Sequence, residues 1–398
     1  MKFFITSIFI FLIGFFIGDI ESRTIKNKIK DFKNKLISSE ENIKVIKANS
    51  FEVEIENFTT LYPEKNDYSE STLRSAGFYL DNQKKDLIYK VFLQDGQILS
   101  KFYKDKIILP DETEYEFNGG LKNIFFIKKK PYGLISMFDK GCYYLSLIEL
   151  ETKKNLISGK CLLIDDSPDF NGSGGAYVHD NKNLYLSIGI PVFFGNEKID
   201  LLAQSKKNIY GKILKINKEK LFPETEYQVY TIGHRNPQGL TKVGEDMFST
   251  EHGPQGGDEL NVIKENMNYE WPYRSLGTRY GDGKSYKSEI IIDNSKNPIY
   301  SFIPSIAPSS LISCPENIGS FYKQNICLIS LSLRSQSIYI FLIDIENKNL
   351  VSYEQIKIGK RMRHFGLDFN GNLFIDKNSF YVISDDLEIL KITFKNFR

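Results

Sequence analysis

The sequence predicts an all-β fold, and two observations lead to this prediction. From about residue 51 onward, short runs rich in β-branched and aromatic residues recur between turns of Gly, Asn, Asp and Pro, which is typical of short strands joined by tight turns. Long amphipathic helical patterns are absent from the same region. Many short strands at this spacing are typical of a sandwich, a barrel or a propeller. Roughly 340 residues correspond to about six blades of 40–60 residues each, although no clean internal repeat gives that number directly.

The predicted strands are the apolar runs of this region. They are Leu87–Leu93, Ile98–Leu109, Asn123–Lys128, Leu134–Phe138, Cys142–Leu150, Leu156–Ile164, Leu184–Ile188, Gly211–Ile216, Tyr227–Ile232, Cys327–Ser332, Ser337–Ile345 and Leu387–Phe394.

Two different segments precede the β region. Phe3–Ile17 is an apolar run behind Lys2, about as long as the apolar part of a secretion signal and shorter than the roughly 20 residues of a membrane span. We therefore expect residues 1–20 to be a signal peptide or a membrane anchor, with a buried N-terminal strand or helix as the alternative. Residues 21–50 are rich in Lys and Glu and carry apolar residues at helical spacing, which predicts a helical linker. The β fold would then occupy residues 51–398.

Charge and cysteine content narrow the functional class. The chain has 52 basic and 50 acidic side chains and a net charge of +2, so no overall field favours nucleic acid. Its four cysteines form two close pairs. Cys142 and Cys161 flank a predicted hairpin, and Cys314 and Cys327 bracket a short segment with a polar turn. Such pairs indicate disulfides in a periplasmic or secreted protein, with free buried thiols as the alternative.

One stretch of the sequence carries residue types suited to a bound cofactor. Gly233–Leu240 reads GHRNPQGL, Glu251–Asn261 reads EHGPQGGDELN, and Asn268–Pro272 reads NYEWP. Arg, Asn and Gln beside a Pro supply fixed donors for a planar anionic ligand. Gly and Pro turns with Asp and Glu supply the oxygen ligands that calcium requires. The alternative interpretation is an acidic turn that binds nothing.

These segments resemble the signature of the soluble glucose and aldose-sugar dehydrogenases that depend on pyrroloquinoline quinone (PQQ), a family that includes relatives of sorbosone dehydrogenase. The resemblance extends over about residues 205–375, through 211–216, 304–309, 361–363 and 368–373. It implies a six-bladed β-propeller with PQQ lying on calcium at one end of the central channel.

The resemblance also implies roles for individual residues. The implied quinone contacts are Arg235, Asn236 and Gln238, the implied partners of its carboxylates are Arg361 and Arg363, and Arg334 takes the position of a quinone-binding lysine. Gly253 and Pro254 would give carbonyl oxygens to calcium, while Asp258 and Glu259 would brace the loop or hold a second ion.

The chain departs from the family where catalysis is expected. Asn171 takes the position of the histidine that removes the sugar hydroxyl proton, Gly175 takes that of an arginine, and Ile190 that of the aspartate that orients the histidine. An amide has no basic lone pair near neutral pH, so Asn171 cannot be a general base. Asp165, Asp166 and Asp169 are the nearby carboxylates that could replace it.

Three functions are consistent with this pattern. The first is a quinoprotein oxidoreductase that oxidises an aldose at C1 to a lactone with PQQ and calcium and an altered base. The second is a catalytically impaired propeller that binds a cofactor, a sugar or a protein. The third is another reaction, on a lactone or polysaccharide, on the same scaffold. The sequence does not indicate the electron acceptor, and residues 3–17 could anchor the protein to a membrane.

Overall fold

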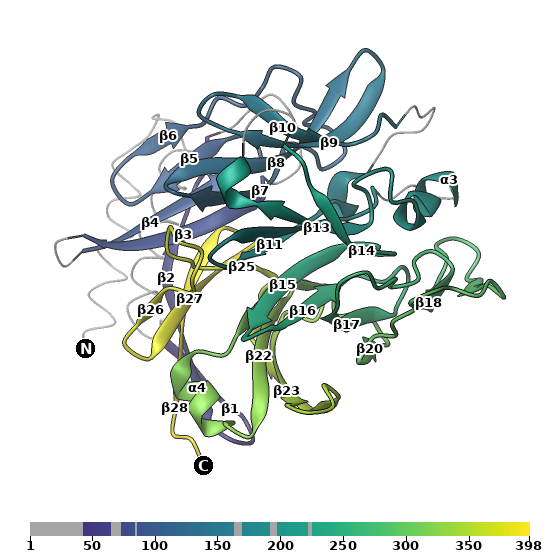
Figure 1. The fold of residues 1–398 in the computed structure, drawn as a ribbon. Coiled ribbons are helices and arrows are strands. Elements are labelled where there is room, and N and C mark those ends of the chain that lie inside the picture. The colour runs from purple at the N-terminus through teal and green to yellow at the C-terminus, as the bar shows by residue number, and fades with distance from the viewer. Residues whose placement is uncertain (1–42, 65–72, 84–85, 163–168, 192–196, 222–224) are drawn as a thin grey trace, which may run out of the picture. The chain divides into compact units, whose positions relative to one another are not determined.

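Six antiparallel sheets follow one another along the chain (Figure 1). The computed structural model describes residues 43–64, 73–83, 86–162, 169–191, 197–221 and 225–398. The first three sheets consist of β3 (Ser75–Gln83), β4 (Asp86–Leu93), β5 (Gln97–Ser100) and β6 (Lys104–Lys106); β7 (Leu121–Ile127), β8 (Lys130–Asp139), β9 (Cys142–Glu149) and β10 (Lys154–Ser158); and β11 (Gly174–His179), β12 (Asn183–Ile188), β13 (Lys212–Asn217) and β14 (Gln228–Ile232).

The next two sheets repeat the pattern. They consist of β15 (Pro237–Val243), β16 (Asp246–Glu251), β17 (Asp258–Ile263) and β20 (Tyr300–Phe302); and β21 (Pro308–Ser313), β22 (Asn325–Ser332), β23 (Ser337–Asp344) and β24 (Leu350–Lys357). A separate hairpin, β18 (Arg274–Thr278) with β19 (Ser285–Lys287), leaves the fourth sheet between β17 and β20.

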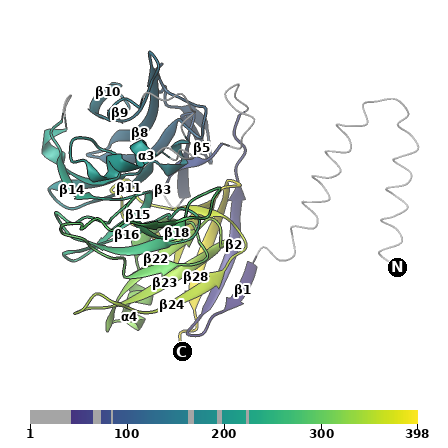
Figure 2. The same cartoon turned by 90° about the vertical axis from the view of Figure 1, so that its right-hand side faces the viewer.

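The sixth sheet joins the two ends of the β region. β25 (Met362–Phe365), β27 (Ser379–Ser384) and β28 (Glu388–Lys395) are extended by β2 (Glu52–Thr60), which lies antiparallel beside β28 in Figure 2. The short strand β26 (Ile375–Asp376) pairs with β27, and β1 (Ile43–Lys47) follows β2 at the sheet edge. A strand from the start of the chain therefore completes a sheet built from its end.

The first strands of the sheets pack side by side in a closed ring. β3 contacts β7, β7 contacts β11, β11 contacts β15, β15 contacts β21, β21 contacts β25, and β25 contacts β3. Six sheets around a central channel, five of four strands and one of six, make a six-bladed β-propeller, which confirms the predicted fold class. Helical structure within the described residues is limited to short pieces, α3 (Glu197–Asp200), α4 (Glu316–Phe321) and the 3-10 turns Phe170–Gly172, Leu201–Gln204 and Lys218–Lys220.

Apolar side chains between the blades hold the ring together. Alternate residues of a strand share a face, so Leu184, Leu186 and Ile188 of β12 all enter one cluster with Phe125 and Leu134 of the preceding blade. Each is essentially inaccessible to solvent, and burying such a side chain contributes roughly 1.5–3 kcal/mol. This packing fixes where each inner strand begins, and therefore where the residues of the site lie.

Two of the remaining predictions can be compared with this structure. Both expected cysteine pairs are disulfides, Cys142–Cys161 and Cys314–Cys327. The helical linker expected over residues 21–50 was wrong for residues 43–47, which form β1 because the apolar and polar residues of Ile-Lys-Val-Ile-Lys suit a sheet edge. The rest of that linker as far as residue 42, and the signal or anchor expected at residues 1–20, lie outside the described residues. Among the residues that are described, no helix has the length and apolar character needed to cross a membrane.

Candidate functional site

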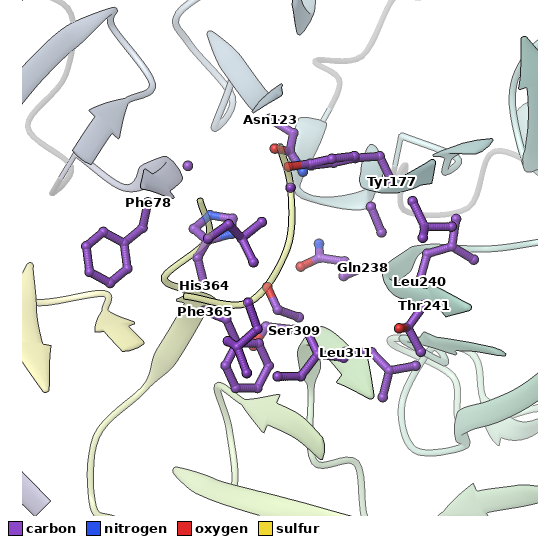
Figure 3. Close-up of a pocket in the computed structure, with 18 of the residues that line it drawn as sticks. Phe78, Asn123, Tyr177, Gln238, Leu240, Thr241, Ser309, Leu311, His364 and Phe365 are labelled. Atoms are coloured by element: carbon purple, nitrogen blue, oxygen red, sulfur yellow. The ribbon is translucent and has the colours of Figure 1, made fainter. Parts of the chain in front are cut away.

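The central channel contains a cavity of about 610 Å³. Side chains from the inner strands of all six blades line it, several of which are labelled in Figure 3. One from each blade is Tyr79, Asn123, Tyr177, Gln238, Ser309 and His364. A single ligand in this cavity would therefore contact every blade.

The segment before β15 reaches the channel rim with its polar groups already oriented. Arg235 is buried, and its Nη1 donates to the carbonyl oxygens of His252 (3.2 Å) and Gly253 (2.7 Å). Its guanidinium carbon lies 5.3 Å from the ring centroid of Trp271, within the range of a cation–π contact. The GHRNPQGL, EHGPQGG and NYEWP segments therefore meet around one arginine.

Asn171 lies in the same group of residues. Its backbone oxygen accepts hydrogen bonds from Asn236 Nδ2 (3.3 Å) and Gln238 Nε2 (3.1 Å). Asp169 caps the 3-10 turn that carries Asn171 by accepting from its backbone N–H at 3.0 Å. Arg74, just before β3, donates from Nη1 to Asn171 Oδ1 at 2.5 Å. Three segments that are far apart in sequence thus converge at the N-terminal ends of the inner strands.

Arg361 and Arg363 share one carboxylate. Asp385 accepts from Arg361 Nε at 2.9 Å and from Arg363 Nε at 2.5 Å. Burial opposes ionisation of Asp385, but the two arginines outweigh it and hold the pKa of that carboxyl below its ordinary value. Arg363 lines the channel cavity, whereas Arg334 is exposed and is not among the residues that line it.

The loop between β16 and β17 is folded tightly on itself. A Cβ at Gly253 would lie 2.3 Å from the carbonyl oxygens of both Gly256 and Gly257, so this position has no room for a side chain. Asp258 fastens the loop by accepting from the N–H of Gly253 (2.9 Å), the hydroxyl of Ser305 (3.0 Å) and two further backbone N–H groups, at residues 306 and 307. The Pro254 carbonyl accepts from the Tyr280 hydroxyl at 3.0 Å.

Glu259 differs from Asp258 in its surroundings. It is paired across the sheet with Glu251, and Asn261 Nδ2 donates to both carboxylates. Burial, reinforced by the charge of Glu251, raises the pKa of Glu259 well above its ordinary value. Among the described residues, no group of three or more His, Cys, Asp or Glu side chains is arranged to hold a metal ion.

The positions at which the sequence departs from the family contain no proton acceptor. Ile190 is buried in an apolar cluster, and Gly175 contributes no side chain. Asp165 and Asp166 lie outside the described residues. Asp169 accepts from Asn118 Nδ2 (3.2 Å) as well as from the backbone of Asn171.

The four histidines are all engaged elsewhere or distant. His234 bonds to Glu251, His252 to the Pro308 carbonyl and His364 to the Ser75 carbonyl. His179 is at the far end of β11, away from Asn171.

Three residues of the rim were not predicted from the sequence. Arg74, Lys122 and Asp385 each stand outside any recognisable motif. Arg74 and Lys122 line the cavity directly, and Asp385 reaches it through Arg363. Arg74 precedes β3, Lys122 lies at the start of β7, and Asp385 follows β27, all at this end of the propeller. Such positions can be recognised only when the ends of the strands are known.

The fold and the polar rim together define a sugar-dehydrogenase-type propeller. The model of the glucose/sorbosone dehydrogenase family matches residues 146–380, which is more than half of the chain. The chain therefore belongs to this family.

Individual relatives agree with this assignment. The aldose sugar dehydrogenase YliI of Escherichia coli is 29% identical over 154 residues, covering 35% of this chain and 40% of that protein. The crystal structure of the soluble aldose sugar dehydrogenase of E. coli in its apo form superimposes with a TM-score of 0.63 at 18% identity, over 86% of this chain and 99% of the other. The PQQ-bound aldose sugar dehydrogenase of Streptomyces coelicolor gives a TM-score of 0.55 at 18% identity, over 86% and 98%. The sequence matches span about half or less of the length of the curated relatives.

The rim has the donor set that PQQ requires. Three carboxylates and a planar quinone call for several guanidinium and amide donors, and Arg235, Asn236, Gln238, Arg361 and Arg363 offer both. Within the described residues the Nη groups of Arg361 and Arg363 make no hydrogen bond, since each arginine uses Nε for Asp385. The carbonyls of Gly253 and Pro254 are ligands of the type that calcium takes, although Arg235 and Tyr280 already donate to them.

Proposed function

We propose that this protein is a quinoprotein sugar dehydrogenase that binds PQQ and calcium at the channel rim and oxidises an aldose at C1 to a lactone. The observation that carries the proposal is that Gln238, Arg363 and Asn171 line one cavity reached by all six blades, while Asn236 and Gln238 both donate to the backbone oxygen of Asn171. Arg235, in the same segment as these two donors, is held by the Gly253 carbonyl. Membership of the glucose/sorbosone dehydrogenase family supports it.

The residues of the rim would divide the work of binding. Arg361 and Arg363, positioned by Asp385, would bind carboxylates of the cofactor. Arg235, held by the carbonyls before and within the Gly253 loop, would contact the quinone together with Asn236 and Gln238, and Gly253 and Pro254 would share calcium. Bound there, PQQ would supply the two-electron acceptor that no amino acid side chain provides.

A second candidate function rests on Asn171 and Ile190. A propeller that binds PQQ without oxidising a sugar would need the cationic rim but no base, and neither of these two positions offers one. We rank it second because Arg235, Gln238 and Arg363 retain donors of the type that a quinone requires, and because an amine, that of Lys122, also lines the cavity.

Reconstitution tests both functions. Purified protein is titrated with PQQ with and without calcium, the binding is followed by absorbance and fluorescence, and dye reduction is then measured with aldoses. We expect Arg363→Gln to weaken quinone binding roughly 10- to 100-fold, because a hydrogen bond to a charged group contributes about 1.5–3 kcal/mol. Arg398→Gln is the matched control, since Arg398 also pairs with a carboxylate, Glu52 at 3.0 Å, but at the C-terminus.

The outcomes separate the candidates. Quinone binding with sugar-dependent dye reduction supports the dehydrogenase. Quinone binding without turnover supports the second function, and absence of quinone binding overturns both. A quinone affinity that does not change when calcium is removed overturns the calcium part of the proposal.

We also propose that the protein is periplasmic or secreted, with residues 1–20 as a signal peptide or membrane anchor. The two disulfides support an oxidising compartment. Cell fractionation and N-terminal sequencing of the mature protein test this: a cytoplasmic protein with reduced cysteines would contradict it.

A further inference from the structure

Lys122 is the second residue of β7 and lines the channel cavity together with Asn171, Arg74 and Arg363. Its Nζ donates to the backbone oxygen of Asn118. The side chain of Asn118 in turn donates to Asp169 at 3.2 Å, the residue that caps the turn carrying Asn171. Lys122 and Asn171 therefore belong to one connected network at the rim.

The charges around Lys122 favour its neutral form. No carboxylate of the described residues lies within ion-pair distance of its Nζ, while two guanidinium groups, Arg74 and Arg363, face the same cavity. Burial, with a further contribution from the charges of Arg74 and Arg363, lowers the pKa of Lys122 to about 7, and Asp169 opposes this shift. A lysine in this environment presents an amine lone pair at neutral pH.

A second lysine shows that burial alone does not make such a group available. The pKa of Lys212 is also lowered to about 7 by burial, but its Nζ donates to three carbonyl oxygens, those of Leu202, Ala203 and Tyr210. Lys212 is thus held within its blade, away from the cavity. Lys122 donates one such hydrogen bond, to Asn118, and lines the cavity. Its amine is therefore accessible to a ligand, whereas that of Lys212 is not.

Two histidines, His179 and His364, also line the cavity, and His179 lies at the opposite end of β11 from Asn171. His364 is therefore the histidine to compare with Lys122. Its Nε2 donates to the Ser75 carbonyl at 2.9 Å, and burial and Arg363 lower its pKa to about 4. His364 is therefore the weaker base of the two. A base is most effective when its pKa lies near the working pH, which favours Lys122.

We propose that Lys122 is the general base of this site and takes the role that Asn171 cannot perform. This inference rests on the proposed dehydrogenase function. In the step, the O–H bond of the sugar hydroxyl breaks and its proton bonds to Nζ of Lys122. The C–H bond of the carbon that bears this hydroxyl breaks, and the carbon–oxygen double bond forms. The electron pair of the C–H bond leaves as hydride, for which bound quinone would be the acceptor. Lys122 gains the proton and the quinone gains two electrons, so the step is balanced.

Kinetics of quinone-loaded variants test the assignment. We expect Lys122→Met to lower kcat/KM by roughly 10²- to 10⁴-fold. Lys122→Arg keeps the positive charge but supplies no base below about pH 12, so it should lose as much. Asn171→His introduced into Lys122→Met should recover part of the lost activity, since it places an imidazole where the family has one. Lys242→Met is the control: Lys242 lines the same cavity four residues along β15 from Gln238, about 13 Å away.

The pH dependence distinguishes a base from a residue that only supports the site. The wild-type kcat/KM should rise with pH through the pKa of Lys122 and reach a plateau above it, because only the neutral amine accepts a proton. The carboxylates of bound quinone would offset the positive charges of Arg74 and Arg363, and so raise the pKa of Lys122. The rising limb in the loaded enzyme should therefore lie at a higher pH than the pKa of Lys122 in the free protein. Lys122→Met should lose the limb, and Lys242→Met should keep it.

A measurement without cofactor or turnover completes the test. Competitive acetylation of the free protein across a pH series, read by peptide mass spectrometry, reports the fraction of each lysine that is neutral. We expect the reactivity of Lys122 to reach half its maximum near pH 7, well below the ordinary lysine value of about 10.4. Titration of Lys122 near its ordinary pKa, an active Lys122→Arg, or an unchanged kcat/KM in Lys122→Met would each overturn the inference. Failure of the wild type to oxidise any sugar would instead overturn the proposed function and remove the reaction that Lys122 serves.

Discussion

Arg74 Nη1 and Asn171 Oδ1 are joined by a hydrogen bond of 2.5 Å that links residues 97 positions apart. Because a guanidinium can only donate, this bond fixes the orientation of the amide. One lone pair of the Asn171 oxygen is taken by Arg74, and the Nδ2 group adds two donors, so this side chain offers no base to a ligand.

Arg74 also controls the charge of Lys122, which gives the first prediction. Arg74→Met removes one of the two guanidinium charges that lower the pKa of Lys122. We expect that pKa to rise, by on the order of one pH unit, and the rising limb of the kcat/KM profile to move up with it. Competitive acetylation and a pH–rate profile measure the two effects independently. If the pKa of Lys122 rises in this variant but the rising limb of kcat/KM keeps its pH, Lys122 is not the base that the limb reports.

The second prediction concerns the clamp formed by Asp258. Each of its carboxylate oxygens accepts two hydrogen bonds from the Gly253 loop or residues 305–307. Asp258→Asn replaces one acceptor oxygen by an NH₂ group that faces donors, so two bonds are lost at a buried position. We expect a loss of about 2–4 kcal/mol in the free energy of unfolding, measured by urea denaturation. Asp282→Asn is the matched control, because Asp282 also accepts from a backbone N–H, that of Lys284, but on an exposed turn, and it should change the stability by less than about 0.5 kcal/mol.

The third prediction follows from the pKa of Asp385. Arg363 and Arg361 lower this pKa in the folded protein, so the unfolded chain binds the proton more tightly. The resulting stability is present above the ordinary aspartate pKa of about 3.9 and is lost as the pH falls through the lower folded value. We expect the urea midpoint of the wild type to fall more steeply between pH 5 and about pH 2.5 than that of Asp385→Asn. Parallel curves for the two proteins would show that the ion pair does not contribute.

The blades could be predicted from the sequence more readily than the channel. Middle strands of the blades, such as Ser337–Asp344, are mostly apolar because both faces pack against neighbouring blades, and the sequence predicts them directly. Of the six inner strands, only β7 was expected from the apolar pattern, as Asn123–Lys128 where the structure has Leu121–Ile127. The others, such as Pro237–Val243 and Pro308–Ser313, carry Pro, Gly and Ser, since one face lines a polar cavity and the strands approach one another closely. Propensity therefore identifies these segments as turns.

The same distinction applies to the site. Arg235, Asn236 and Gln238 stand in a long motif whose residue types already indicate a cofactor, and the structure brings them together. Lys122 and Arg74 have no such context: a lone lysine after Gly-Gly-Leu resembles many surface lysines. Their importance depends on two guanidinium groups and an amine facing one cavity from three blades, which is a property of the closed ring and of no local segment.

The last prediction concerns the two disulfides, which lie in different blades and should act independently. Cys142–Cys161 joins the start of β9 to the segment after β10, and Cys314–Cys327 joins the segment after β21 to β22, with sequence separations of 19 and 13. Closing loops of this size restricts the unfolded chain by about 3 kcal/mol each. We expect each paired Cys→Ser variant to lose about that amount in urea denaturation, and the variant lacking both bridges to lose close to the sum, because distant sites contribute additively.

Dithiothreitol should lower the free energy of unfolding of the wild type to that of the variant lacking both bridges, and should leave that variant unchanged. None of the four cysteines is among the residues that line the cavity, so quinone affinity measured well below the unfolding transition should be the same in all four proteins. A loss of affinity in either variant would show that the rim depends on that blade's covalent closure.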